Sequence, residues 1–206
     1  MEKPQKEKTL IVIKHDGVAR GIVGEIIHRY EKAGLKVVAI KMLHPTKEMA
    51  DAHYQATPED LARMGGNTLR DAAEKGVDVK VKFGTDDAQE IGKFIKKWLI
   101  DYLNEGPVIA FVLEGYNAIK IGRKITGATL PSEAAPGTIR GDLTHDNPEL
   151  ANFYDRPMRN LVHASGKPSE ATFEIALWFT PEEIFEYDRV DEEAMFGPIK
   201  PVQPKK

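Results

Sequence analysis

Residues 9–43, TLIVIKHDGVARGIVGEIIHRYEKAGLKVVAIKML, contain two apolar runs separated by an amphipathic segment. The first run, TLIVI at 9–13, is short and rich in β-branched residues, which is typical of a buried strand. Residues 19–32 repeat their apolar side chains at helical spacing, and Gly34 follows where a C-cap glycine belongs. The second run, at 35–43, predicts another strand. The stretch therefore predicts a strand, a helix and a second strand.

The rest of the chain continues this alternation of strands and helices. The further predicted elements are a helix at 47–54 capped by Thr46, a helix at 91–102, a strand at 107–113, a helix at 115–125, a loop at 126–157, a strand at 172–179 and a short helix opened by Pro181. Because strands alternate with helices, we expect a sheet covered by helices.

One segment interrupts this pattern. Residues 57–93 hold two helical stretches, at 59–64 and 68–75, and an alternating DVKVKF run, all punctuated by glycines. This pattern is typical of an inserted lid or subdomain. We therefore expect a single domain over 1–189 with this insertion. Residues 190–206 are rich in proline and predict an extended tail.

The composition excludes several classes of function. The apolar fraction of 41% and the charged fraction of 30% are those of a water-soluble globular protein. The net charge of −3 argues against nucleic acid or an anionic membrane as the main partner. Cysteine is absent, which excludes disulfides and thiol catalysis. The charged start, MEKPQKEK, and the lack of a run of about 20 apolar residues predict a cytoplasmic protein without a membrane span.

Candidate anion-binding residues gather in the long loop. Arg123, Thr129 and Arg140 provide two guanidinium groups and a hydroxyl in a segment stiffened by prolines. Long loops on a rigid scaffold often carry function, and a guanidinium suits the oxygens of a phosphate. Taken alone, the arginines could equally form surface ion pairs.

A candidate nucleophile lies in the segment RNLVHAS at 159–165. A neutral histidine can attack phosphorus and carry the phosphoryl group as phosphohistidine. His163 would fill this role with Asn160 nearby, and Glu174 could orient its ring. A lone histidine is more often a structural residue, but the neighbouring basic and amide groups favour chemistry here. Lys14 lies at the end of the first strand, where it would reach into a ligand cleft.

Three other patterns carry no function. The glycines of GVARGIVG at 17–24 lack the G-x-G-x-x-G spacing of a dinucleotide site. The segment GKPS at 166–169 has a proline inside and no upstream glycine of a P-loop. The histidines at 28, 44, 53 and 145 show no metal-ligand spacing with nearby carboxylates, so we expect no metal held by the protein alone.

Together the motifs resemble those of the nucleoside diphosphate kinases. GTIRGD and the N-x-x-H-x-S histidine segment are highly specific in combination. The resemblance rests on five segments in the family's order, which are TLIVIKHDGVARGIVGEII, AHY at 52–54, GPVIAFVLEG at 106–115, GRKITGATLPSEAAPGTIRGD at 122–142, and RNLVHAS followed by EIALWFTPEE.

The resemblance implies an α+β fold with a ferredoxin-like βαββαβ core, an antiparallel sheet covered by helices. It also implies ping-pong transfer of the γ-phosphate of a nucleoside triphosphate, commonly ATP, to a nucleoside diphosphate through phosphorylated His163. Mg²⁺ would arrive on the nucleotide phosphates. The family assembles as homo-oligomers, namely hexamers, tetramers or dimers. The nucleotide-binding positions would be Lys14, Tyr54, Arg123, Thr129, Arg140 and Asn160, with Glu174 orienting the histidine and Lys14 and Tyr54 close to it.

The sequence departs from the family's pattern around the expected base site. His15 replaces a proline, and insertions occupy about 57–96 and 143–156. Counting back from Gly106 places the base-stacking residue at Phe94 or Ile95. We expect the insertions to form a lid that alters base stacking or access. Two alternatives remain, a phosphohistidine donor to protein acceptors and a nucleotide-binding regulatory protein.

Overall fold

A four-stranded antiparallel sheet forms the centre of the protein, which we describe from a computed structural model covering residues 4–74 and 76–198. The strand order is β2-β3-β1-β4, and each neighbouring pair is antiparallel. This is the ferredoxin-like α+β arrangement, so the predicted fold class is confirmed. The strands are β1 (Lys6–Ile13), β2 (Lys36–Leu43), β3 (Val108–Tyr116) and β4 (Val162–Ala164).

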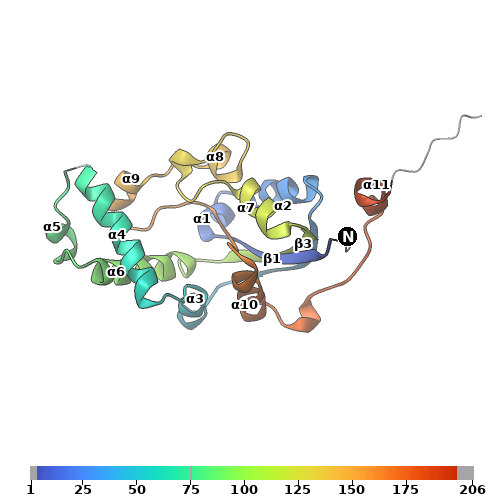
Figure 1. The fold of residues 1–206 in the computed structure, drawn as a ribbon, viewed down its shortest axis with the longest axis horizontal. Coiled ribbons are helices and arrows are strands. Elements are labelled where there is room, and N and C mark those ends of the chain that lie inside the picture. Colours follow the sequence, from blue (N-terminus) through green and yellow to red (C-terminus); the bar gives the residue numbers. More distant parts are fainter. Residues whose placement is uncertain (1–3, 75, 199–206) are drawn as a thin grey trace, which may run out of the picture.

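Helices cover both faces of the sheet and explain why β1 is apolar on both sides (Figure 1). Ile11 and Ile13 join one core cluster, whereas Leu10 and Val12 join the other. Alternate side chains of a strand point to opposite faces, so a strand buried on both faces reads as a continuous apolar run. The helices that contribute to the first cluster are α2 (Val23–Lys32), α7 (Ala118–Thr126) and α8 (Ile139–Leu143), and those of the second are α3 (Lys47–His53), α6 (Ala88–Leu103) and α10 (Pro168–Trp178).

The inserted segment forms helices that extend from one end of the sheet (Figure 1). Its two predicted helical stretches are one helix, α4 (Pro58–Glu74), so the predicted break at Gly65 was wrong. A Cβ on Gly65 would lie 1.9 Å from the carbonyl oxygen of Ala88, and one on Gly92 would lie 2.1 Å from that of Leu61. The glycines therefore permit α4 and α6 to cross closely. The DVKVKF run forms the short helix α5 (Val79–Phe83).

The predicted strand at 172–179 was wrong, because these residues belong to helix α10. The helix begins at Pro168, a residue favoured in a first helical turn. Ala171, Glu174 and Trp178 are its buried residues, and their spacing is helical. The last strand is instead β4, which carries the candidate nucleophile itself.

The remaining segments also contain short helices. The predicted loop at 126–157 contains three of them, and the described part of the tail contains α11, so an extended conformation from residue 190 was wrong for that part. The proline-rich residues 199–206 lie outside the described residues. The short elements are α1 (His15–Ala19), α9 (Pro148–Phe153), α11 (Glu192–Phe196) and the 3₁₀ helices η1 (Pro131–Glu133) and η2 (Pro181–Glu183).

Candidate active site

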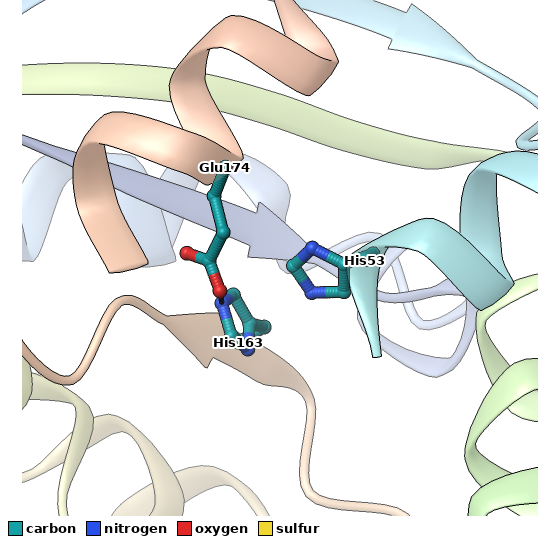
Figure 2. A group of neighbouring side chains, drawn as sticks. All are labelled: His53, His163 and Glu174. Atoms are coloured by element: carbon teal, nitrogen blue, oxygen red, sulfur yellow. Dashed lines mark ion pairs between the residues drawn. The ribbon is translucent and has the colours of Figure 1, made fainter. Parts of the chain in front are cut away.

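His163 lies in the middle of β4, directly opposite Val12 of β1. Its side chain is 19% exposed, and its Nε2 lies 2.9 Å from Oε1 of Glu174 on α10 (Figure 2). The carboxylate lies off the hydrogen-bonding direction of Nε2, so this is a close electrostatic contact rather than an aligned hydrogen bond. The sequence prediction paired these two residues, and the structure brings them together.

The Glu174 carboxylate is buried and has a second partner. Its Oε2 accepts a hydrogen bond of 2.6 Å from the hydroxyl of Ser165, which is fully buried. Burial raises the pKa of Glu174, while nearby His53 and the Ser165 hydroxyl act in the opposite direction. These partners therefore favour the ionised carboxylate next to His163.

The environment of His163 keeps its ring neutral. Burial lowers the pKa of His163 to about 3, assisted by the positive charges of Lys14 and Arg140. The ring therefore has a lone pair at neutral pH. Since Nε2 faces Glu174, the nitrogen available for attack is Nδ1.

Lys14 follows the last residue of β1 and is only 4% exposed. Its ammonium donates a 2.8 Å hydrogen bond to Oδ1 of Asn160 and lies 4.4 Å from the ring centre of Tyr102. Burial, with a further contribution from Arg140, lowers the pKa of Lys14 to about 7, while Asp16 opposes the shift. An anion placed beside this ammonium would favour its charged form.

Arg140 is buried and binds mostly backbone carbonyls. Its guanidinium donates hydrogen bonds to the carbonyl oxygens of Gly127, Ala128, Asn160 and Val162. These bonds use four of the five N–H groups of a guanidinium. Arg140 therefore joins the long loop to the segment before His163, and it can offer a phosphate its charge and at most one N–H.

The other predicted site residues surround this centre with different degrees of exposure. Arg123 on α7 is exposed and donates a long hydrogen bond of 3.3 Å to the carbonyl of Ala164, beside His163. Thr129 is exposed, and its carbonyl accepts a 3.0 Å bond from Asn160. Tyr54 contacts the ring of His53, and burial raises its pKa, so its hydroxyl remains a possible donor.

A cavity of about 430 Å³ lies between the Lys14 side of the site and the insertion, and neither His163 nor Glu174 is part of its wall. Lys14, Thr129 and Asn160 line one part of it, and Phe83 and Trp98 line another. Its volume is in the range of pockets for small molecules. A larger cavity of about 880 Å³ lies along β2 and α10 and includes none of the predicted site residues in its wall.

The cavity distinguishes the two candidates for base stacking. Ile95 lines it, whereas Phe94 does not and is 43% exposed. Phe94 instead contacts Phe83, with ring centres 5.7 Å apart. The second insertion also contributes to the wall through α9 and the residues that follow it. A salt bridge of 3.2 Å between Lys82 and Asp155 joins the two insertions.

Sequence reasoning missed His53 and Tyr102. Tyr102 lies beneath Lys14, and its hydroxyl accepts a 3.0 Å bond from the backbone N–H of Asn160. The ring of His53 lies 4.3 Å from that of His163. No sequence spacing connects these two histidines, which come from α3 and β4. The position of His53 before Tyr54, inside the AHY segment, was the signal available.

His53, His163 and Glu174 have potential ligand atoms within 4.8 Å of one another (Figure 2). A metal would need a lone pair on each histidine nitrogen that faces it. However, Trp178 donates a 3.2 Å hydrogen bond to Nδ1 of His53, which leaves the ring proton on Nε2. The cluster is therefore poorly suited to a metal ion.

Comparisons with known proteins identify the family of the chain. The model of the nucleoside diphosphate kinase family matches residues 7–61 and 87–184. A nucleoside diphosphate kinase of Pyrobaculum aerophilum is 49% identical over 180 residues, which cover 87% of this chain and 98% of that protein. One of Archaeoglobus fulgidus is 40% identical over 190 residues, which cover 92% and 97%.

Two solved structures share the fold. An NDP kinase from Pyrobaculum aerophilum has a TM-score of 0.86 and 47% identity, covering 88% of this chain and all of that one. A nucleoside-diphosphate kinase from Borrelia burgdorferi, a transition-state mimic with bound vanadate and ADP, has a TM-score of 0.74 and 33% identity, covering 94% and 98%. The family match is broken between residues 61 and 87, within the insertion, and continuous across 143–156. The chain belongs to the nucleoside diphosphate kinase family.

Proposed function

We propose that this phosphotransferase, which moves phosphoryl groups between nucleotides, carries the group on Nδ1 of His163. The observation that supports this most strongly is a neutral, largely buried imidazole whose Nε2 faces Glu174 at 2.9 Å. Such a contact holds the ring in one orientation and leaves a single nitrogen for attack. The carboxylate also stabilises the positive charge that the ring gains when Nδ1 forms a bond to phosphorus.

The reaction then has two balanced half-steps. In the first, the lone pair of Nδ1 attacks the γ-phosphorus of a nucleoside triphosphate such as ATP. The bond to the bridging oxygen breaks, and the diphosphate leaves with that electron pair. In the second, a terminal oxygen of another nucleoside diphosphate attacks the phosphohistidine phosphorus, and the N–P electron pair returns to Nδ1. This is a ping-pong scheme.

Phosphoryl transfer depends mainly on positioning and charge neutralisation. Lys14 and the two arginines place three cationic side chains around His163, and all three lower its pKa. We assign Mg²⁺ to the nucleotide phosphates rather than to a protein site, because the groups nearest the phosphates would be cationic. Bound there, the ion neutralises phosphate charge. Arg140 contributes through its charge, since its donors bind carbonyls.

A labelling experiment tests this proposal. Incubation with γ-labelled ATP is expected to give an acid-labile, base-stable phosphoprotein, and a nucleoside diphosphate should then remove the label as triphosphate. His163→Ala should abolish labelling while nucleotide binding is retained. His28→Ala, at an exposed position on α2, is the matched control and should label normally. Label that remains in His163→Ala, or label that no diphosphate removes, would contradict the proposal. Transfer only to a protein acceptor would favour the alternative of a protein phosphodonor.

We further propose that the insertion forms the base end of the nucleotide site. Lys14 and Asn160 would lie at the phosphate end of the 430 Å³ cavity, and Phe83 and Trp98 at the end facing the base. The two rings lie 5.8 Å apart, and the Lys82 ammonium lies 5.3 Å from the Trp98 ring centre. Aromatic faces bind any base by stacking, which gives low base selectivity. Ile95 lines the same cavity and adds apolar contact.

Phe83→Ala should raise the KM for nucleotides by roughly 5- to 30-fold, the effect of losing about 1–2 kcal/mol of stacking, with little change in kcat. Phe94→Ala is the matched control, because it removes the aromatic neighbour of Phe83 without changing the cavity wall. Inhibition by tripolyphosphate, which has no base, should be the same in both variants and in the parent. Equal KM values for the two variants would contradict the assignment.

We also propose that the chain forms homo-oligomers through β2. This strand is at the edge of the sheet and exposes Ile40 and Met42, which are 52% and 58% accessible. Apolar edge strands tend to pair with another chain. Light scattering would measure the assembly, and Met42→Lys should weaken it.

Among the described residues, none of the helices has the length and apolar character required to cross a membrane. A cytoplasmic location stays a prediction.

A further inference from the structure

His53 is a buried histidine beside the nucleophile that the proposed mechanism does not use. It is the last residue of α3 and only 6% exposed. Its ring meets that of His163 edge to face, with ring centres 4.3 Å apart and planes at 78°. Its other ring neighbours are Tyr54 and Trp178.

The hydrogen bond from Trp178 fixes the tautomer of His53. An indole N–H can only donate, so the 3.2 Å bond from Nε1 of Trp178 makes Nδ1 of His53 the acceptor. Burial lowers the pKa of His53 well below its ordinary value, so the ring is neutral and its one proton is on Nε2. Within residues 4–74 and 76–198, this Nε2 is buried without a hydrogen-bond partner.

An unpartnered buried N–H is costly, and it points to an acceptor. The nearest anionic group is Glu174, since the potential ligand atoms of His53, His163 and Glu174 lie within 4.8 Å of one another. The three side chains converge from α3, β4 and α10 (Figure 2). Glu174 already accepts a hydrogen bond from Ser165 at its other oxygen.

We propose that His53 is a positioning residue whose Nε2–H faces the Glu174 carboxylate and thereby fixes the orientation of His163. This inference rests on the proposed phosphohistidine mechanism. The proposed chain of contacts leads from Trp178 to His53, from His53 to Glu174, and from Glu174 to Nε2 of His163. His53 does not touch the nucleotide in this proposal. It holds the carboxylate in the charged state and in the place where it contacts the nucleophile.

The electrostatic surroundings of Glu174 are consistent with this role. Burial raises the pKa of Glu174, and the hydrogen bond from Ser165 acts against it, as the dipole of a neutral His53 Nε2–H would. Around His163, the charged groups are Lys14 after β1, Arg123 on α7, Arg140 on α8 and Glu170 on α10. Without the Nε2–H of His53, the pKa of Glu174 should rise, so the carboxylate should take up a proton at a higher pH than in the parent protein. A protonated Glu174 no longer stabilises the cationic phosphohistidine ring.

Two substitutions separate positioning from packing. Glutamine in His53→Gln can place an amide N–H near the position of Nε2, whereas asparagine in His53→Asn reaches only the position of Nδ1. Both remove the ring. Single-turnover phosphorylation of His163 by ATP should slow by roughly 10- to 100-fold in His53→Asn, with unchanged ATP affinity, and His53→Gln should recover most of the rate. The acid limb of the rate profile should move to higher pH in His53→Asn and return towards the parent value in His53→Gln.

Equal rates and equal acid limbs in the two variants would overturn the proposal. If neither variant folds, as judged by circular dichroism, the tautomer of His53 in the parent protein tests the proposal instead. A two-bond ¹H–¹⁵N NMR correlation should show the His53 proton on Nε2, and a proton on Nδ1 would overturn the proposal. Absence of any label on His163 in the parent protein would instead refute the proposed function, so the two failures are distinguishable.

Discussion

Lys14 combines burial with a proposed role next to phosphate, and this combination would make nucleotide binding sensitive to pH. Its pKa of about 7 in the free protein is lowered chiefly by burial. Phosphates beside it would raise that pKa, so binding should take up close to one proton at about pH 8 and very little at about pH 6. Affinity should therefore fall as pH rises through about 7. Isothermal titration calorimetry at pH 8 in buffers of different ionisation enthalpy measures this uptake.

Lys14→Met is the control for that prediction. It keeps the length and apolar stem of the side chain but has no ammonium. The proton uptake assigned to Lys14 should disappear in this variant, while protons bound by the nucleotide itself remain. Equal uptake by the variant and the parent protein would show that another group titrates.

The nearness of several candidate site residues was predictable from the sequence, because they lie in short motifs next to the strands; their role in binding phosphate stays a proposal. His163, Asn160 and Glu174 were named together, and the structure places them in one region. Arg140 was predicted as a nucleotide-binding residue, and nothing in the sequence indicated that four of its N–H groups bind backbone carbonyls. His53 was not predictable, since its nearness to His163 arises only when α3 packs beside β4.

At the scale of the element, α4 shows how tertiary contact overrides local propensity. Two consecutive glycines predicted a break, yet the helix continues through them. Gly65→Ala should destabilise the protein by about 1–3 kcal/mol, because the new Cβ would lie 1.9 Å from the Ala88 carbonyl oxygen. Urea unfolding measures the effect.

The neighbouring glycine supplies the matched control. A Cβ on Gly66 would meet no atom within 4 Å. Gly66→Ala should therefore stabilise the protein by up to about 1 kcal/mol through the higher helix propensity of alanine. A Gly65→Ala variant as stable as Gly66→Ala would contradict the close crossing of α4 and α6.

Helix α10 shows a different error, in which a helix was predicted as a strand. Its sequence is rich in aromatic and branched residues, and it was predicted as a strand. The helical signal was Pro168 at its start and the spacing of its three buried residues. Glu174 was nevertheless paired correctly with His163, because either element would place a side chain at the sheet. The closeness of Glu174 and His163 was therefore easier to predict from the sequence than the secondary structure around Glu174.

At the scale of the whole molecule, the core of the fold was predictable because β1, β2 and β3 each contain a clear apolar run. The insertion was recognisable as an insertion, but its shape depends on the packing of α4 against α6. That packing brings Phe83 and Trp98 to the same cavity as Lys14. On the proposed assignment, the nucleotide would lie between the sheet edge, which would supply the chemistry, and the insertion, which would supply the base contact.

The central claim is that one atom of each chain, Nδ1 of His163, carries the phosphoryl group. Phosphorylation of ¹⁵N-histidine-labelled protein by ATP, followed by ³¹P–¹⁵N NMR and mass-spectrometric mapping, tests it most directly. We predict about one phosphate per chain, on His163 and bonded to Nδ1, because Nε2 lies 2.9 Å from Glu174. A phosphate on Nε2, or on any residue other than His163, would contradict the account.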